Sequence, residues 1–213
     1  MKEFLIPVNP FSMNCYIYFD ENSKEGVIFD PAAYTSEEKD HIKKIIAENE
    51  IKIKHIINTH GHIDHILGNK FAKELFKVPV LASDKDKYFF DNANVSAKMY
   101  GVELEDPGQP DEIISEESKI SIGDMEFDII HTPGHSPGSL SFIDHKNKKI
   151  FSGDVIFKSS IGRTDLPFGD YDELMNSIQK LFEKTGDDYH IFPGHMEPTT
   201  VGFEKKNNPF LNE

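Results

Sequence analysis

The chain has almost no cysteine and too few basic residues to balance its acidic ones. Cys15 is the only cysteine among 213 residues, so no internal disulfide can form, and we expect a reducing compartment, the cytoplasm. Lys and Arg total 23 against 37 Asp and Glu, which gives a formal net charge of −14. Nucleic acids and anionic membranes are bound by clustered positive charge, so this balance argues against both as partners.

Long apolar runs are also lacking. The first ten residues contain only a short apolar run, which Pro7 interrupts. This run is too short for a signal peptide or a membrane span, and it predicts a first β-strand instead. No internal repeat and no low-complexity linker is visible. With 38% hydrophobic residues, the chain has the composition of a soluble globular protein, and we take residues 1–213 as one domain.

Hydrophobic periodicity predicts a mixed α/β (α+β) protein in which strands and helices alternate. Helices are expected over Thr35–Glu50, where Thr35 and Glu38 form a capping box, from near Asp64, over Asp84–Asp91 and over Asp170–Lys184. Strands are expected at Leu5–Val8, Cys15–Phe19, Gly26–Phe29, Ile53–Asn58, Val78–Leu81, Lys119–Ile122, Met125–Ile130, Leu140–Ile143, Lys149–Ser152 and Tyr189–Phe192.

A histidine-rich stretch follows one of these strands. Residues 59–65 read THGHIDH, which places His60, His62, Asp64 and His65 within six residues. His60 and His62 are two apart, so in extended chain their rings point to the same side. Imidazoles and a carboxylate without a thiolate suit zinc, iron or manganese in an open site.

Three later stretches supply further ligand types, each at the end of a predicted strand. In the rigid loop HTPGHSPG we favour His135 as a ligand and expect His131 to be a hydrogen-bonded neighbour. Asp154 follows the strand Lys149–Ser152, and its two carboxylate oxygens could bridge two cations. His195 follows Pro193-Gly194 after the last strand. The other histidines outside these loops, His41, His55, His145 and His190, are interpreted as structural or exposed.

The motifs THGHIDH, HTPGHSPGS, FSGD and PGH, in this order, resemble the metallo-β-lactamase superfamily. The stretches IGRTDLPFGD and GFEKKNNPF resemble the short bacterial glyoxalase II-like hydrolases of that superfamily. The resemblance covers essentially the whole chain. It implies a four-layer αβ/βα sandwich, the metallo-β-lactamase fold, with metals at one edge between the two sheets.

The resemblance also implies a ligand set for two divalent metal ions. We expect zinc first, with iron and manganese as alternatives. Asp64 and Asp154 are the carboxylates taken as catalytic, and Asp30 matches an aspartate that supports the metal loops. One metal would be held by His60, His62 and His135, the second by Asp64, His65 and His195, with Asp154 and a hydroxide bridging them.

The implied activity is hydrolysis of a small-molecule thioester such as S-lactoylglutathione. Arg163 matches the family's cationic substrate-binding position and could hold a substrate carboxylate. Only residues 196–213 follow His195, whereas full-length glyoxalase II enzymes carry a helical region that grips glutathione. True β-lactamases commonly have cysteine where Asp154 stands, so antibiotic hydrolysis is not expected.

Three alternatives remain. A persulfide dioxygenase of the same superfamily uses one Fe(II) on the residues that match His60, His135 and Asp154. A superfamily nuclease is disfavoured by the net charge of −14. A non-enzymatic scaffold usually loses ligands, and none is missing here. The oligomeric state is left open.

Overall fold

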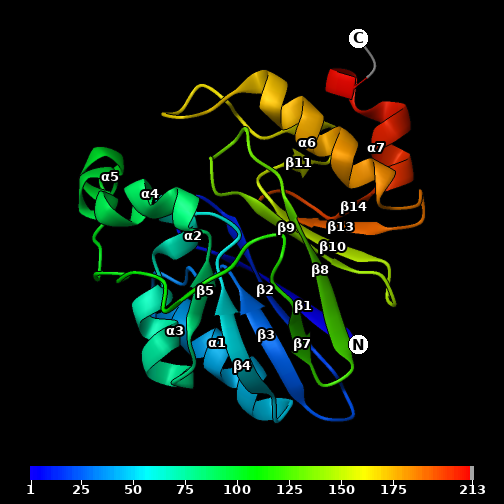
Figure 1. Cartoon of the computed structure of the whole chain (residues 1–213). Coiled ribbons are helices and arrows are strands. Elements are labelled where there is room, and N and C mark those ends of the chain that lie inside the picture. Colours follow the sequence, from blue (N-terminus) through cyan, green and yellow to red (C-terminus); the bar gives the residue numbers. More distant parts are fainter. Residues whose placement is uncertain (212–213) are drawn as a thin grey trace. The chain divides into compact units, whose positions relative to one another are not determined.

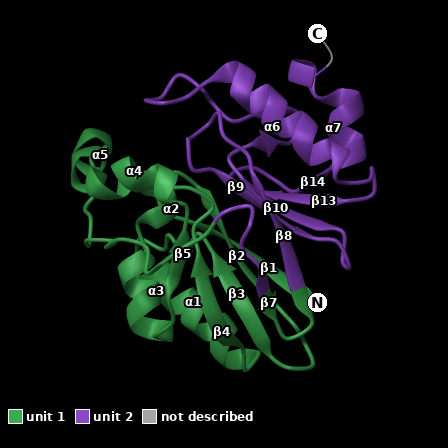
Figure 2. Ribbon diagram, in the orientation of Figure 1, with its two compact units in different colours: residues 1–114, 121–125 green, residues 115–120, 126–213 purple. Residues whose placement is uncertain are grey.

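The computed structural model describes residues 1–211 and divides into two compact units (Figure 2). Unit 1 comprises residues 1–114 and 121–125, and unit 2 comprises residues 115–120 and the chain from residue 126 onward. The described chain contains two six-stranded sheets and one two-stranded sheet, with helices packed on the large sheets (Figure 1). The alternation of strands and helices that the sequence predicts is confirmed.

The first sheet begins as an antiparallel meander and continues as a parallel sheet. Strands β1, β2 and β3 pair antiparallel, and β3, β4, β5 and β6 pair parallel, in the order β1-β2-β3-β4-β5-β6. Strand β2 is buried along its whole length, as expected for a strand in the interior of a sheet. The strands are Lys2–Val8, Met13–Phe19, Glu25–Phe29, Lys52–Ile57, Val80–Ala82 and Glu112–Ile113.

Helix α1 (Ser36–Glu48) shows how local sequence fixes the helices of unit 1. The capping box is present: the Thr35 side chain accepts a hydrogen bond from the Glu38 backbone N–H, and the Glu38 carboxylate accepts one from the Thr35 N–H. Ile42 is fully buried in the same apolar cluster as strand residues Ile28 and Ile56. Five shorter helices follow: α2 (Ile63–Ile66), α3 (Asn69–Phe76), η1 (Asp84–Asp86), α4 (Lys87–Asp91) and α5 (Ala93–Tyr100).

The second sheet has the order β14-β13-β10-β9-β8-β7. Strand β9 pairs antiparallel with both β8 and β10, and β10 pairs parallel with β13. Strands β8, β10 and β13 therefore run in the same direction. The strands are Ile120–Ile122, Met125–His131, Leu140–Asp144, Lys149–Gly153, His190–Pro193 and Thr199–Thr200, and the small pair β11 and β12 is Ile156–Phe157 and Ser160–Ile161.

Helix α6 (Tyr171–Glu183) and helix α7 (Val201–Asn207), followed by the short η2 (Pro209–Leu211), belong to unit 2 (Figure 1). The Asp170 side chain accepts from the Glu173 backbone N–H and caps α6 as predicted. Leu174, Ile178 and Leu181 form one buried stripe at helical spacing, and they share an apolar cluster with strands β8, β9, β10 and β13.

Several details of the predicted elements were wrong. The helix expected from near Asp64 is broken into α2 and α3 at Gly68, where an added Cβ atom would lie 1.9 Å from the Pro31 carbonyl oxygen. The chain approaches itself too closely there for a residue with a side chain, so position 68 requires glycine. The prediction also missed the helices α5 and α7 and the two-residue strands β6, β11, β12 and β14. Both helices are short, and helix α5 carries apolar residues on its exposed side, including Val95 and Met99.

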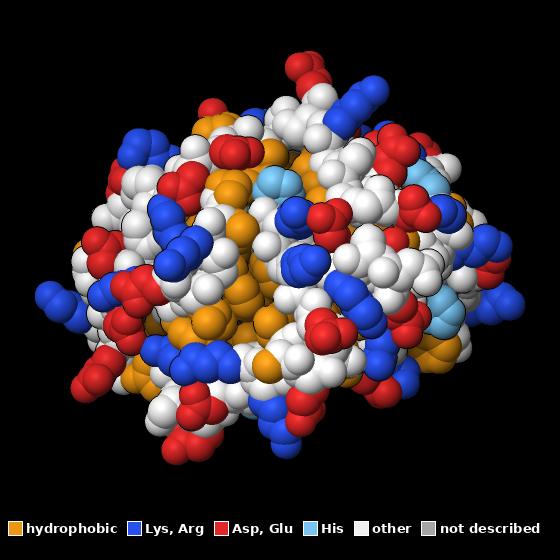
Figure 3. All heavy atoms as spheres, turned by 90° about the horizontal axis from the view of Figure 1, so that it is seen from below, with side chains coloured by type: hydrophobic (Ala, Val, Ile, Leu, Met, Phe, Trp, Pro, Cys, Tyr) orange, Lys and Arg blue, Asp and Glu red, His pale blue; other side chains and the backbone are white. Residues whose placement is uncertain are grey.

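No helix in residues 1–211 combines the length and apolarity needed to cross a membrane. On the face seen in Figure 3, acidic and basic side chains are interspersed.

Candidate metal centre

In unit 1 the polar residues of interest lie at the carboxyl ends of neighbouring parallel strands. Asp30 follows β3, the stretch His60–His65 follows β4, and Asp86 follows β5. Parallel strands end at the same edge of a sheet, so the sheet itself gathers these side chains. The histidine-rich stretch therefore lies where the sequence predicted it, in the loop after a buried strand and at the start of a helix.

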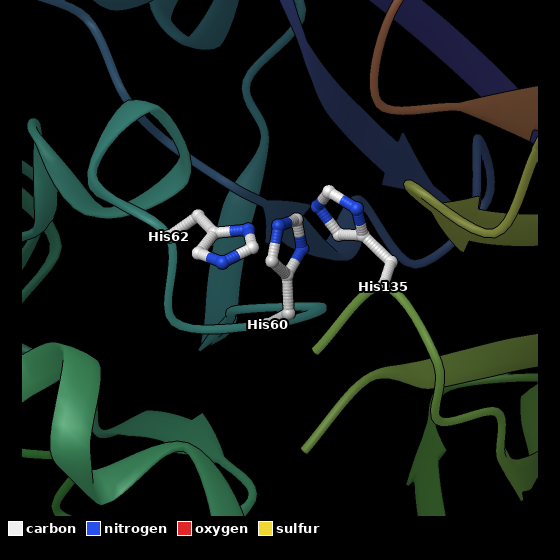
Figure 4. A group of neighbouring side chains, drawn as sticks. All are labelled: His60, His62 and His135. Carbon is white, nitrogen blue, oxygen red and sulfur yellow. The ribbon is translucent and has the colours of Figure 1, made fainter. Parts of the chain in front are cut away.

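The imidazoles of this loop lie close together and are shielded from solvent. The His60 ring centroid lies 4.8 Å from that of His62 and 4.0 Å from that of His65. The exposed fractions of the three residues are 2%, 9% and 0%. Figure 4 shows the rings of His60 and His62 on the loop after β4 and, from unit 2, the ring of His135 on its own loop. Asp64 Oδ2 lies 3.9 Å from His65 Nε2, so a carboxylate accompanies the three rings.

Asp30 orients two of these rings. Its Oδ2 accepts a hydrogen bond from His65 Nδ1 at 2.9 Å and from the Thr59 hydroxyl at 2.7 Å. Because the Thr59 hydroxyl donates to Asp30, its oxygen accepts from His60 Nδ1 at 3.1 Å. Both rings are thereby held with the proton on Nδ1, so the lone pair that could bind a cation is the one on Nε2. The supporting role that the resemblance implied for Asp30 fits this network.

Further contacts, which no sequence motif predicts, fix the backbone of the loop. The Asp86 carboxylate accepts from the Gly61 N–H at 2.7 Å, between the two histidines. An added Cβ on Gly61 would lie 3.0 Å from the Asp86 Cβ, so the loop is packed closely against the residues after β5. Asn9 Nδ2 donates to the Asp64 carbonyl oxygen at 2.8 Å. These partners lie 25 and 55 residues from the groups they hold, and a single sequence does not pair such distant positions.

Unit 2 gathers its candidate residues in the same way. His135, Asp154 and His195 follow β8, β10 and β13, the three strands that run in one direction. The pairing of β10 with β13 shifts register between Phe151 and Gly153, and Gly153 has a φ of +53°. A bulge of this kind re-aims the next side chain, which here is Asp154.

The Asp154 carboxylate lies close to both histidines of unit 2. Its Oδ2 is 3.5 Å from His135 Nε2 and 3.7 Å from His195 Nε2. Ligands that share a cation at bond lengths of about 2.0–2.2 Å lie roughly 3–3.5 Å apart, so these separations approach those of ligand atoms. Asp154 and His135 are buried, and His195 is half-buried.

The two histidines of the loop after β8 make different contacts. His135 Nδ1 donates to the Arg163 carbonyl oxygen at 2.8 Å, because a carbonyl can only accept, and Nε2 is then the nitrogen that could bind a metal. His131 Nε2 donates to the Pro137 carbonyl oxygen at 2.7 Å, the hydrogen bond expected of a structural neighbour. Gly134 has a φ of +123°, and an added Cβ would lie 2.2 Å from the Leu174 nitrogen of α6.

The Arg163 side chain forms an ion pair with Asp165. Its Nε and Nη2 donate to the two oxygens of Asp165, both at 2.7 Å. This bidentate pair is exposed. The role of Arg163 as a substrate anchor stays a prediction. Its guanidinium already forms an ion pair with Asp165, which was not predicted from the sequence.

The donor set of each unit fits a divalent metal. Unit 1 offers three imidazoles and one carboxylate, and unit 2 offers two imidazoles and one carboxylate. Nitrogen and oxygen donors of this kind suit zinc, iron or manganese. Burial raises the pKa of the Cys15 thiol well above its usual value, so this cysteine provides neither a thiolate ligand nor a nucleophile.

Known proteins match this chain over nearly its whole length. The model of the metallo-beta-lactamase superfamily matches residues 8–195. Hydroxyacylglutathione hydrolase GloC of Haemophilus influenzae is 38% identical over 210 residues, which cover 98% of this chain and 97% of that protein.

Solved structures extend the likeness to the fold. The crystal structure of BLEG-1 B3 metallo-beta-lactamase superposes with a TM-score of 0.90 at 34% identity, with 100% of both chains covered. That of TTHA1623 in a di-iron-bound form gives a TM-score of 0.87 at 29% identity, covering 98% of this chain and 100% of that one. The fold class predicted from the sequence is confirmed.

Proposed function

Because the chain belongs to the metallo-β-lactamase superfamily, we propose that it is a hydrolase that depends on two divalent metal ions. His60, His62 and His135 are proposed to hold the first ion, and Asp64 and His65 are proposed to hold the second. His195 completes the ligand set of the second ion, and Asp154 bridges the two ions.

One observation carries the dinuclear assignment. A single oxygen of Asp154 lies 3.5 Å from His135 Nε2 and 3.7 Å from His195 Nε2, two nitrogens that the proposal assigns to different ions. The closeness of this oxygen to one proposed ligand of each ion supports a bridging role for Asp154. The hydrogen bonds to His60, His65 and His135 support the assignment, because each uses Nδ1 and directs Nε2 to the cation.

When bound, the two ions would make a water molecule acidic enough to attack at neutral pH and would polarise the scissile carbonyl. The chain's contribution is positional. Asp30 holds two rings in one tautomer, Asp154 sets the spacing between the two ligand groups, and Asp64 completes one of them. No serine or cysteine nucleophile is required, and the only cysteine is buried with a raised pKa.

We propose a thioester as the substrate, of the glyoxalase II type. The support is the printed activity of the relative from Haemophilus influenzae, a hydroxyacylglutathione hydrolase, which aligns over 98% of this chain. A thiolate leaves readily, so such a reaction needs little further acid catalysis beyond the metal centre. Zinc is the proposed metal, and iron is the alternative because TTHA1623 was crystallised in a di-iron-bound form.

The test is a panel of substrates on the metal-loaded protein. We expect hydrolysis of S-lactoylglutathione, followed as release of the thiol, without consumption of oxygen. Oxygen uptake with glutathione persulfide and no thioester turnover would assign the persulfide dioxygenase reaction instead. A β-lactam in the panel tests the activity in the name of the BLEG-1 structure, and turnover of the β-lactam alone would also contradict the proposal.

A further inference from the structure

Residues 163–170, in the loop between β12 and α6, are hydrogen-bonded at both ends to the turn that carries the proposed ligand His135. The Arg163 carbonyl oxygen accepts from His135 Nδ1, and the Asp170 N–H donates to the Gly134 carbonyl oxygen, both at 2.8 Å. Within the loop, the Gly169 N–H donates to the Leu166 carbonyl oxygen at 2.9 Å. The backbone of this loop therefore keeps a defined position relative to His135.

Arg163 and Asp165 form the charged part of this loop. The guanidinium uses Nε and Nη2, one complete donor edge, on the two oxygens of Asp165. That hydrogen bonding lowers the pKa of Asp165 to about 2, so the carboxylate is ionised throughout the neutral range. The exposed fractions of the two side chains are 59% and 71%, so solvent screens the pair, and an ion pair this exposed can exchange partners at small cost.

We propose that Asp165 is a specificity-determining residue that competes with the substrate for Arg163. A substrate carboxylate that binds Arg163 either takes the Nε–Nη2 edge from Asp165 or binds a guanidinium whose charge Asp165 already compensates. In both cases it gains little over a neutral substrate. The inference deepens the proposed function and rests on it: the enzyme would accept thioesters of anionic and of neutral thiol carriers with similar KM values.

The decisive variant is Asp165→Asn, which keeps the size of the side chain and removes its charge. We expect the KM for S-lactoylglutathione to fall roughly two- to fivefold, the factor that corresponds to the strength of an exposed ion pair. The KM for S-lactoyl-N-acetylcysteamine, a thioester without carboxylates, should keep its value. The gain should fall on KM and leave kcat unaltered, because the carboxylate is remote from the bond that breaks.

Two further variants separate this effect from general ones. Asp188→Asn removes the same charge from another exposed ion pair of unit 2, that with Lys148, and should not change the ratio of the two KM values. In an Arg163→Ala background, Asp165→Asn should have no effect on that ratio, since the group for which it competes is gone. An equal shift of both KM values in Asp165→Asn, or an unchanged or higher KM for S-lactoylglutathione, would overturn the proposal.

A binding measurement keeps this inference distinct from the proposed function. S-methylglutathione carries the same carboxylates and cannot be hydrolysed as a thioester, so calorimetry reports its Kd whether or not the protein is a thioesterase. Tighter binding by Asp165→Asn than by the wild type supports competition at Arg163, even if no thioester is cleaved. Equal or weaker binding, or no binding by either protein, overturns it, even if S-lactoylglutathione is turned over.

Discussion

Asp30 Oδ2 lies 2.9 Å from His65 Nδ1, and the two side chains are 2% and 0% exposed. The same carboxylate controls the His60 ring through the Thr59 hydroxyl. Asp30 also has a φ of +46°, a backbone conformation that is uncommon for residues other than glycine. One strained, buried carboxylate thus fixes the tautomer of two proposed ligands, and the strained conformation is held by a dense hydrogen-bond network.

Replacing Asp30 with Asn should weaken metal binding without removing any ligand. The carboxylate accepts from the Thr59 hydroxyl and His65 Nδ1 with Oδ2 and from the Thr59 backbone N–H with Oδ1, so an amide must turn its NH2 group toward one of these donors. We expect the metal affinity to fall by about 10- to 100-fold, the usual effect of losing such a partner. Titration with a competing chelator measures it.

The control for this variant is Asp144→Asn. Asp144 is equally buried, and its oxygens accept from the Asn147 backbone and side chain, away from the proposed ligands. Its replacement should lower stability and leave metal affinity unchanged. If Asp30→Asn binds metal as tightly as the wild type, the Asp30 carboxylate does not orient the rings.

Asp154→Ala should be more damaging than Asp64→Ala. The bridging carboxylate serves both proposed ions and keeps the ligand sets at a common spacing, whereas Asp64 serves one. We expect Asp154→Ala to lose both metals and nearly all turnover, and Asp64→Ala to keep the ion bound by the histidines of the other set. Residual kcat and metal content of the two variants decide the point, and equal losses in both would show that Asp154 does not bridge.

Gly162→Ala should disturb the site by steric pressure alone. An added Cβ would lie 1.9 Å from the Asp154 carbonyl oxygen and 3.3 Å from the His135 Cβ, so the backbone that carries a proposed ligand must move. We expect a loss of about 1–3 kcal/mol in the free energy of unfolding, together with weaker metal binding. Thermal unfolding and chelator titration report the two effects.

Gly108→Ala is the matched control, because Gly108 has no heavy atom within 4 Å of an added Cβ, although its φ is +70°. It should lose a little stability through backbone strain and keep its metal affinity. Metal affinity that falls equally in both glycine variants would refute the steric account.

Burial lowers the pKa of His55 below its ordinary value of 6.5. The unfolded chain therefore takes up a proton at this residue as the pH falls through about 6.5, while the folded protein does not until a lower pH. Folding stability contributed by neutral His55 is present above pH 6.5 and is lost on acidification.

His55→Gln should remove this component, so its free energy of unfolding should decline less than that of the wild type between pH 7.5 and 5.5. Denaturant unfolding of the metal-free proteins measures both slopes. His190→Gln, at the exposed start of β13, controls for the loss of an imidazole as such. Equal slopes in His55→Gln and the wild type would contradict the assignment.

Much of the fold was predictable because its signals are local. The capping box of Thr35 and Glu38, the Asp170 cap and the stripe of Leu174, Ile178 and Leu181 each lie within one helix. The ligand types were predictable for the same reason, since each follows a strand in a short motif. The close approach at Gly68 was not, because the Pro31 carbonyl oxygen belongs to another segment.

The partners of the candidate ligands were predictable only in part. Asp30 was found through the resemblance, whereas Asp86 and Asn9 act on backbone groups and leave no pattern in a single sequence. Arg163 and Asp165 are only two residues apart in sequence, yet acidic residues near an arginine are too common for this spacing to indicate an ion pair. Packing of distant segments, and not a local motif, decides which backbone group a side chain contacts.

Metal content shows whether the seven proposed ligands hold two ions. The measurement is elemental analysis of the native protein, purified without added metal and again after metal loading, against protein concentration from amino-acid analysis. The account predicts close to two divalent ions per chain, zinc first. A firm value of one iron per chain, with no second ion taken up under metal-replete conditions, would contradict it.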